Sequence, residues 1–467
     1  MPRYSRWWTF AIVCLALFMG MLDNLVVVTA LPSIGRSLHA AVPDLEWIVN
    51  AYTLTFAVLL MPASALGDRF GRKRVLLFGV TLFAAGSISA ALAGSATLLI
   101  AARALQGVGG AMITPLTLTM LTRAFPAEQR AAAIGLWSGV SGLGLAAGPL
   151  IGGAIVNGLS WNAIFWVNVP VAILLLILGN WRLEESRGVP VPLDLPGIAL
   201  VGLGLFGIVY GLIRGNSLGW GNGQIVLAFA VGVLLLAAFL LRERRTASPM
   251  LDLALFLRPG FSAANVAGFL MSAGMFGSIF LITLYVQTVL HYTPLRAGLG
   301  TMPWTATIML VAPFAGILAG RIGSRPPVIV GLTAQATSLF WLSHVTSLTT
   351  PYHALLPVFI LGGLGMGLVF APLSAAVMGT IDEAHSGQAS GSYNAFRELG
   401  GVFGVAILGA VFQHVATTPA AFLSGFHTAL VSGAVLLLVG LLSAFNLPGA
   451  VRLSTSLPEH ASAAAVV

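Results

Sequence analysis

Four charged side chains lie inside long apolar runs of this sequence, namely Asp23, Arg103, Arg397 and Glu398. A charge is costly in hydrocarbon, so each of them needs a partner or a wet cavity. An acid in that setting can take up and release a proton, and a neighbouring guanidinium can adjust how tightly the proton is held. The first chemistry to consider is therefore proton transfer.

Asp23 and Arg103 lie at similar depths in their runs. Asp23 comes eight residues before Leu31, about 12 Å from the end of its helix at 1.5 Å per residue. Arg103 lies about 7–8 Å into a run that enters from the same side. We interpret the two as a proton-coupling pair in which Asp23 carries the proton or meets a cationic substrate. A purely structural ion pair between the two helices is the alternative.

Arg397 and Glu398 lie near the middle of the apolar run at 389–413, at the depth where transport sites tend to be found. Glu398 is either a second protonation site or a buried partner for another helix. Adjacent residues on a helix point in different directions, so we do not expect these two to pair with one another.

The elements that carry these residues are membrane-spanning helices. Of 467 residues, 58% are hydrophobic and only 8% are charged, against roughly a quarter charged in soluble domains. Runs of about 20 apolar residues cross a bilayer. The sequence predicts an all-α polytopic membrane protein with runs at 7–31, 47–66, 75–93, 98–122, 131–157, 163–180, 194–213, 224–241, 261–289, 296–319, 327–345, 354–380, 389–413 and 424–445.

The basic residues predict the orientation. Of 22 Lys and Arg, three (Arg36, Arg214 and Arg296) fall on one set of loops and two (Arg103 and Arg397) inside helices, which leaves seventeen for the other side. Positive loops stay in the cytoplasm, so both termini are expected to be cytoplasmic in the cell (inner) membrane. The positive charge is scattered rather than clustered, which argues against nucleic-acid binding.

An internal repeat predicts the domain organisation. Leu66, Arg69 and Gly71 recur as Leu318, Arg321 and Gly323 at a shift of 252, and Gly148 and Gly152 recur as Gly400 and Gly404. Six helices take about 180 residues, so the shift leaves about 70, enough for two further spans. We expect a six-helix bundle at 1–182, an inserted helix pair at 183–258, a second pseudo-symmetric six-helix bundle at 259–446 and a cytoplasmic tail at 447–467.

Several motifs lie in order on these runs. A loop reads D-R-F-G-R-K from Asp68 to Lys73, and a later run reads G-L-A-A-G-P-L-I-G-G from Gly144 to Gly153. Leu22 and Asp23 are followed by A-L-P, and Arg103 begins R-A-L-Q-G-V-G-G. With these motifs the chain resembles the major facilitator superfamily, specifically its fourteen-helix drug:proton antiporter branch, over nearly its whole length.

The resemblance implies proton-driven export of small hydrophobic or amphipathic compounds, often cationic drugs or antibiotics, by alternating access. It implies that the helices of Asp23 and Arg103 are neighbours. The first motif is expected to gate the inner side, with Asp68 near the start of the helix at 389–413; its residues are Asp68, Arg69, Gly71, Arg72 and Lys73, with Arg321 as their counterpart. The second is expected to form the seam between the bundles through Gly144, Gly148, Pro149, Gly152 and Gly153, with ordinary small-residue packing as the alternative.

Uncharged polar residues in the runs are candidates for the substrate cavity, although each alone is more often packing than ligand. They are Asn24, Gln106, Asn265, Gln287 and Asn394. Asp44 and Glu46 precede a run, and we expect them in a solvated loop at the outer mouth; the alternative is that they draw in cations or accept protons there.

The alternatives are an exporter dedicated to one endogenous metabolite, such as an antibiotic or siderophore, and, less favoured, a symport importer. No catalytic constellation, metal-ligand spacing or phosphate-binding loop is present in the sequence, so an enzyme, a metal site and a cofactor are not expected, and the proton motive force replaces ATP. The expected partners are a small-molecule substrate, protons and membrane lipid. We expect a functional monomer, joined by a periplasmic adaptor if the host is Gram-negative.

Overall fold

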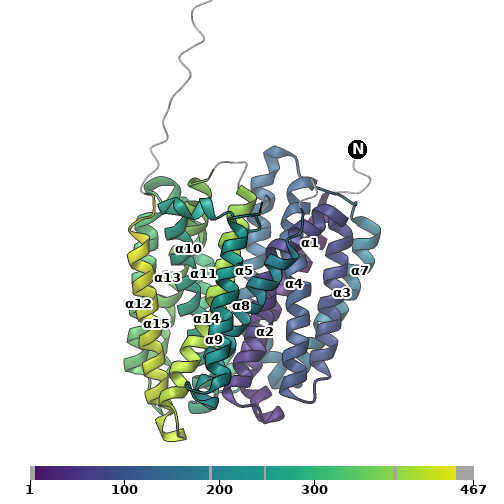
Figure 1. The fold of residues 1–467 in the computed structure, drawn as a ribbon. Helices are drawn as coiled ribbons and strands as arrows, with labels where there is room; N and C mark the ends of the chain where they lie inside the picture. Colours follow the sequence, from purple (N-terminus) through teal and green to yellow (C-terminus); the bar gives the residue numbers. More distant parts are fainter. Residues whose placement is uncertain (1–5, 189–191, 247–248, 382–385, 449–467) are drawn as a thin grey trace, which may run out of the picture.

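A computed structural model describes residues 6–188, 192–246, 249–381 and 386–448. Within these ranges the secondary structure is entirely helical, and fourteen helices are long and apolar enough to cross a membrane. This confirms the predicted all-α polytopic fold. Helix α1 begins and helix α15 ends at one face of the molecule, here called the terminal face, and the other end is called the distal face (Figure 1).

The first bundle consists of α1 (Arg6–Leu38), α2 (Val42–Phe70), α3 (Arg72–Ala91), α4 (Ala96–Ala124), α5 (Ala127–Gly158), α6 (Ala163–Trp166) and α7 (Asn168–Arg182). Helix α4 packs against both α2 and α3, and α5 packs against α1. The predicted helix at 163–180 is divided into α6 and α7, which together form one candidate span.

The second bundle repeats this packing. It consists of α10 (Pro259–Leu284) with its π-helical extension η2 (Tyr285–Val289), α11 (Pro294–Ile322), α12 (Arg325–Val345), α13 (Tyr352–Gly379), α14 (Ser386–Val415) and α15 (Phe422–Ala444). Helix α13 packs against α11 and α12 as α4 packs against α2 and α3, and α10 packs against α14 as α1 packs against α5. Equivalent helices therefore occupy equivalent places, as the internal repeat predicts.

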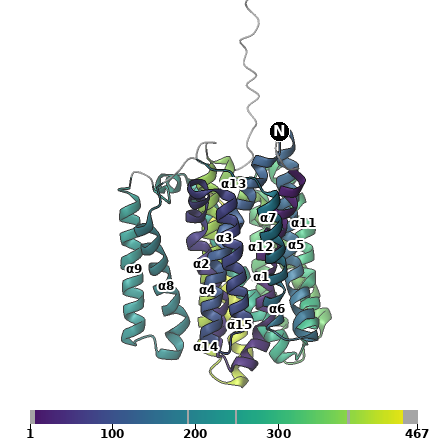
Figure 2. The same ribbon diagram turned by 90° about the vertical axis from the view of Figure 1, so that its right-hand side faces the viewer.

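Two helices stand outside the bundles. Helix α8 (Leu195–Leu218) packs against α9 (Gly223–Glu243) and also against α2 and α14, whereas α9 lies at the edge of the molecule (Figure 2). Asp194 caps α8 by accepting from the Gly197 amide at 2.9 Å. Large side chains of α9 such as Leu227 and Leu234 are exposed, as expected of a helix that faces lipid.

The two bundles meet along two helix pairs, α5 with α11 and α2 with α14. At the first seam Gly153 lies against the backbone of Pro294 and Leu295, and Gly298 lies against the backbone of Pro149. Glycine allows this approach because it has no Cβ, and small residues of this kind are typical of close helix contacts in membranes.

Candidate functional site

Asp23 and Arg103 form an ion pair between α1 and α4 that is sealed from solvent, with both side chains 1% exposed. Two further donors reach the same carboxylate: the side-chain amide of Asn168 at 2.7 Å and that of Gln106 at 3.2 Å, both to Oδ1. Arg103 donates through Nη1 to the other oxygen, Oδ2. A buried carboxylate with a cation and two amide donors is fully partnered, which is what a charge in the membrane interior requires.

The network continues around Arg103. Its Nε donates to the Ile48 carbonyl of α2 at 3.3 Å, and its guanidinium lies 4.4 Å from the centre of the Tyr52 ring. Ser87 of α3 accepts from Gln106 at 2.8 Å and from Asn168 of α7 at 3.2 Å. Helices α1, α2, α3, α4 and α7 are thus tied to one carboxyl group. A proton on Asp23 would remove the negative charge that holds Arg103, so it would loosen the core of the first bundle.

Sequence reasoning identified the two charged residues of this network, gave Gln106 another role and missed the other members. Gln106 was expected to line the substrate cavity, whereas its side-chain amide is hydrogen-bonded to Asp23, Arg103 and Ser87. Ser87, Asn168 and Tyr52 were not singled out. They carry no local motif, and the one available signal is that each is a polar side chain inside an apolar run.

Arg397 and Glu398 do pair with one another, so the expectation that they would not is wrong. Arg397 Nη2 lies 2.8 Å from Glu398 Oε1, and the Arg397 guanidinium also lies 4.9 Å from the centre of the Phe370 ring of α13. The rotation between adjacent helical residues keeps short side chains apart, but the long arginine side chain bends around the helix. In an apolar bundle, pairing is favoured over two separate charges.

The loop from Asp68 to Lys73 is held by its own bundle and by the segment that follows α7. Asp68 pairs with Arg72 at 2.7 Å. Lys73 donates through Nζ to the Asn180 carbonyl at 2.8 Å, and the Glu185 carboxylate accepts from the Lys73 and Arg74 amides at 3.1 and 3.2 Å. Glu185 therefore caps the N-terminus of α3. This role was not predicted, because Glu185 lies far from α3 in the sequence.

The remaining residues of this loop are at the terminal face. Gly71 has φ 109°, a conformation that favours glycine, and a Cβ there would meet the Glu185 carboxylate. Arg69 and its counterpart Arg321 are exposed. The expected partner of Asp68, the start of α14, adjoins residues 382–385, which lie outside the described residues, so that contact remains a prediction.

The glycine stripe of α5 has two faces. Gly144, Gly148 and Gly152 pack against α1 of the same bundle, and the expectation that they form the seam between bundles is wrong. Gly153, with the carbonyl of Pro149, does contact α11 across the seam. Residues four apart share a helix face, so the Pro149–Gly153 pair is turned about 100° from the Gly148–Gly152 pair and meets a different neighbour.

The proposed cavity residues are spread over the molecule. Asn265 donates to the Phe261 carbonyl at 2.9 Å, and Asn394 to the Ser390 carbonyl at 2.9 Å, each within its own helix. Gln287 donates to the Thr29 carbonyl of α1 at 2.8 Å and so joins the two bundles. Asn24 is partly exposed. In this conformation these side chains are not gathered into one pocket.

Asp44 and Glu46 are not in a solvated loop. Helix α2 begins at Val42, earlier than predicted, because Pro43 opens it and the Asp44 carboxylate accepts from the Ala41 amide at 3.2 Å. Asp44 also pairs with Arg214 of α8 at 2.9 Å. Glu46 is completely buried.

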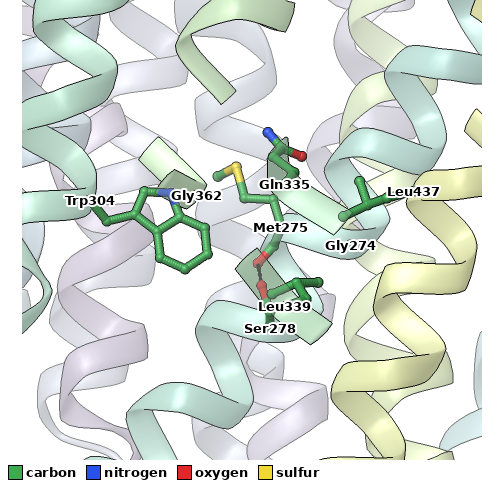
Figure 3. A pocket seen from close by; sticks show the side chains of 8 residues that line it. All are labelled: Gly274, Met275, Ser278, Trp304, Gln335, Leu339, Gly362 and Leu437. Carbon is green, nitrogen blue, oxygen red and sulfur yellow. Dashed lines mark hydrogen bonds between the residues drawn. The ribbon is translucent and has the colours of Figure 1, made fainter. Parts of the chain in front are cut away.

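The second bundle contains a small cavity at the place equivalent to the Asp23 network (Figure 3). The shift of 252 carries Asp23 onto Met275, Tyr52 onto Trp304 and Ser87 onto Leu339, and all three line this cavity. The side-chain amide of Gln335 and the indole N–H of Trp304 are buried there without a hydrogen-bond partner. The two bundles therefore differ in chemistry at equivalent positions.

Comparison with known proteins identifies the family. Residues 13–405 match the profile of the Major Facilitator Superfamily. The chain is 36% identical to the tetracenomycin C resistance and export protein of Streptomyces glaucescens, over 87% of this chain and 76% of that one. It is 37% identical to the multidrug efflux pump LfrA of Mycolicibacterium smegmatis, over 87% and 81%, and 36% identical to the cephamycin export protein CmcT of Amycolatopsis lactamdurans, over 91% and 89%.

Among solved structures, a crystal structure of the peptide transporter POT superposes with a TM-score of 0.70 over 94% of this chain and 95% of that one, at 17% identity. At this identity the likeness concerns the fold alone.

Proposed function

Because the chain belongs to the major facilitator superfamily, we propose that this multi-pass membrane protein exports small hydrophobic or amphipathic drugs or antibiotics in exchange for protons. Family members are transporters rather than enzymes and generally need no cofactor. The proposed energy source is the proton motive force. The observation that carries the proposal is the sealed network around Asp23, since a buried carboxyl group tied to five helices links its charge to the packing of a whole bundle.

The coupling follows from electrostatics. With Asp23 charged, Arg103 and the amides of Gln106 and Asn168 hold α1 to α4 and α7. When a proton neutralises Asp23, the ion pair is lost and these helices can shift, which changes the face to which the central site opens. Glu398, paired with Arg397 in the other bundle, is proposed as a second coupling carboxylate.

The orientation is supported by the basic residues, which are concentrated at the terminal face, proposed to be cytoplasmic. Hydrogen bonds from Gln287 to Thr29 and from Gln413 to Glu46 join the bundles, and both lie toward the distal face. This fits a conformation closed to the outside. The loop from Asp68 to Lys73, with Arg321, is proposed to latch the cytoplasmic side in the opposite conformation.

We further propose the division into bundles at 1–182 and 259–446, a linker at 183–258 and a cytoplasmic tail, in a cell membrane protein that works as a monomer surrounded by lipid. Asn24, Asn265 and Asn394 are proposed to meet substrate once the bundles separate. If the host is Gram-negative, a periplasmic adaptor would extend the route outward.

A second candidate is an exporter dedicated to a single antibiotic made by the host. Two relatives, the tetracenomycin C and cephamycin export proteins, are named for single antibiotics, which favours it. The two candidates predict different breadth: a dedicated exporter protects against one chemical class, and a multidrug exporter protects against several.

The proposal is tested in a pump-deficient bacterium that expresses the chain, challenged with dyes, quaternary ammonium compounds and antibiotics with and without a protonophore. We expect protection that the protonophore removes. Asp23→Asn should abolish it while the protein remains in the membrane, because an amide cannot exchange a proton. The matched control is Asp252→Asn, since Asp252 caps a short helix by accepting from the Ala254 amide at 2.9 Å and asparagine caps equally well. Unchanged efflux by Asp23→Asn would remove Asp23 from the mechanism.

A further inference from the structure

Glu46 is a buried acid that the Asp23 network does not use. It lies in the first turns of α2, near the distal face, and its side chain is fully enclosed. One carboxyl oxygen accepts from the side-chain amide of Gln413 on α14 at 2.7 Å. The other oxygen, Oε2, is buried with no hydrogen-bond partner. An acid with one unpartnered buried oxygen is unusual, because such groups are normally satisfied.

The neighbourhood of Glu46 is the contact between the two bundles. Gly409 of α14 lies directly against the carboxyl group, where a Cβ would overlap it. Helix α8 braces the same place: Arg214 pairs with Asp44 of α2, and Asn216 donates to the Ala410 carbonyl of α14 at 2.6 Å. Glu46 is therefore enclosed only because α2, α14 and α8 are in contact.

The positive charges around Glu46 are already compensated. Arg214 is the cation whose field reaches it, and Arg214 is paired with Asp44. From α4, Arg103 bonds the Ile48 carbonyl but is paired with Asp23. Of the other titratable groups at this end, Arg36 of α1, His39 directly after α1 and His414 of α14 are exposed, and Tyr210 of α8 is partly buried against Trp47. An ionised Glu46 in the closed seam would thus be a buried charge with one amide for support, which is strongly unfavourable.

We propose that Glu46 is a further proton-binding site, separate from Asp23 and Glu398, which takes up one proton from the distal side as the seam between α2 and α14 closes. The carboxylate becomes a carboxylic acid, and the proton returns to the same side when the seam opens and water reaches Oε2. Closure at the distal face is therefore favoured by external acid. The proposal rests on the proposed alternating access, but it concerns the seam and not the cargo.

The test measures seam opening directly, without transport. The single native cysteine is removed by Cys14→Ala, and Ala410→Cys places a thiol on α14 beside Gly409, where the side chain is 6% exposed. Labelling by a membrane-impermeant thiol reagent from outside is followed from pH 5 to 8 and divided by the labelling of Thr418→Cys, an exposed position at the same face. This ratio removes the pH dependence of the thiol chemistry.

The normalised rate should fall with acidity by up to about tenfold per pH unit through the transition, as for a one-proton equilibrium. Glu46→Gln, which resembles the protonated acid, should label slowly at every pH, and Glu46→Asp should keep the dependence with a shifted midpoint. The control Asp252→Asn should keep the parent's pH profile. Asp23→Asn should lose efflux but keep a pH-dependent labelling rate, with a midpoint that moves with the conformational equilibrium. The proposal is overturned if Glu46→Gln shows the parent's pH profile, or, should that variant fail to insert, if Glu46→Asp leaves the midpoint unchanged.

Discussion

The cores of the two bundles are built from equivalent helices, but the first carries a charged network at positions where the second has neutral side chains. In the first, Asp23 and Arg103 are enclosed by Gln106, Asn168 and Ser87, and each of these side chains has a hydrogen-bond partner. In the second, Met275 and Leu339 stand where Asp23 and Ser87 would be, beside a small cavity onto which Gln335 and Trp304 bring unpartnered polar atoms.

The difference shows that the repeat preserves packing more strongly than chemistry. Helix positions are set by small residues and backbone approach, which both halves share, as at Gly148 and Gly400. The side chains in the centre are free to diverge once the helices around them pack. At the position of Asp23 the first bundle can then hold a charge that responds to protons, whereas the equivalent position in the second bundle is neutral and less tightly hydrogen-bonded.

Among variants that test the difference between the two cores, Arg103→Ala should cause the largest loss of stability. It leaves Asp23 as a buried charge without its cation, which costs about 3–5 kcal/mol. Thermal unfolding of the purified protein in detergent should show this loss, and adding Asp23→Asn should recover much of it. Trp304→Phe, at the position equivalent to Tyr52 in the neutral core, is the control and should change stability little. Additive effects of the Arg103 and Asp23 changes would contradict the network.

A substitution at the seam between α5 and α11 should have a smaller effect on stability than one in the Asp23 network. Gly153→Ala places a methyl group against Leu295 of α11 and should cost about 1–3 kcal/mol through overpacking. We expect slower efflux in vesicles with little change in proton binding at Asp23. Gly142→Ala is the matched control on the same helix, because a Cβ there meets nothing within 4 Å. Equal slowing by both variants would show that helix flexibility, and not the seam, is responsible.

The smallest expected effect comes from comparing Gln106, whose side-chain amide is hydrogen-bonded, with Gln335, whose buried amide has no partner. Gln335→Leu removes buried polar atoms that have no partner and should be neutral or stabilising by about 1 kcal/mol. Gln106→Leu removes an amide that Asp23, Arg103 and Ser87 use, and should destabilise by about 1–3 kcal/mol. Chemical denaturation measures both, and the opposite signs are the prediction; a loss of stability in Gln335→Leu would mean that ordered water satisfies the cavity.

Much of the fold follows from local sequence. Runs of about 20 apolar residues have few soluble alternatives, and in lipid a helix is the arrangement that satisfies its own backbone. The fourteen predicted spans are therefore found in the structure, with differences at their ends. The predicted start of α2 was too late, because Pro43 and Asp44 are residue types common in loops but here open and cap the helix.

The candidate site was less predictable. Charge in an apolar run identified Asp23 and Arg103, because desolvation forces such residues to find partners. Nothing in the local sequence distinguished Asn168 from any asparagine near a helix end, and the pairing of Arg397 with Glu398 depends on the path of a long side chain. Glu46 was assigned to solvent because it lies just before an apolar run and just after Pro43 and Asp44, whereas its neighbours in space belong to α14.

The sequence by itself predicted fourteen helices long and apolar enough to cross a membrane, an internal repeat, and which charges in apolar runs need partners. These are consequences of composition and periodicity, which act within one helix. Only the tertiary structure decided which glycines face the same bundle and which face the other, and which acid is paired and which is left with an unpartnered oxygen. Those properties depend on which helices become neighbours, since burial and hydrogen bonding are shared between residues hundreds of positions apart.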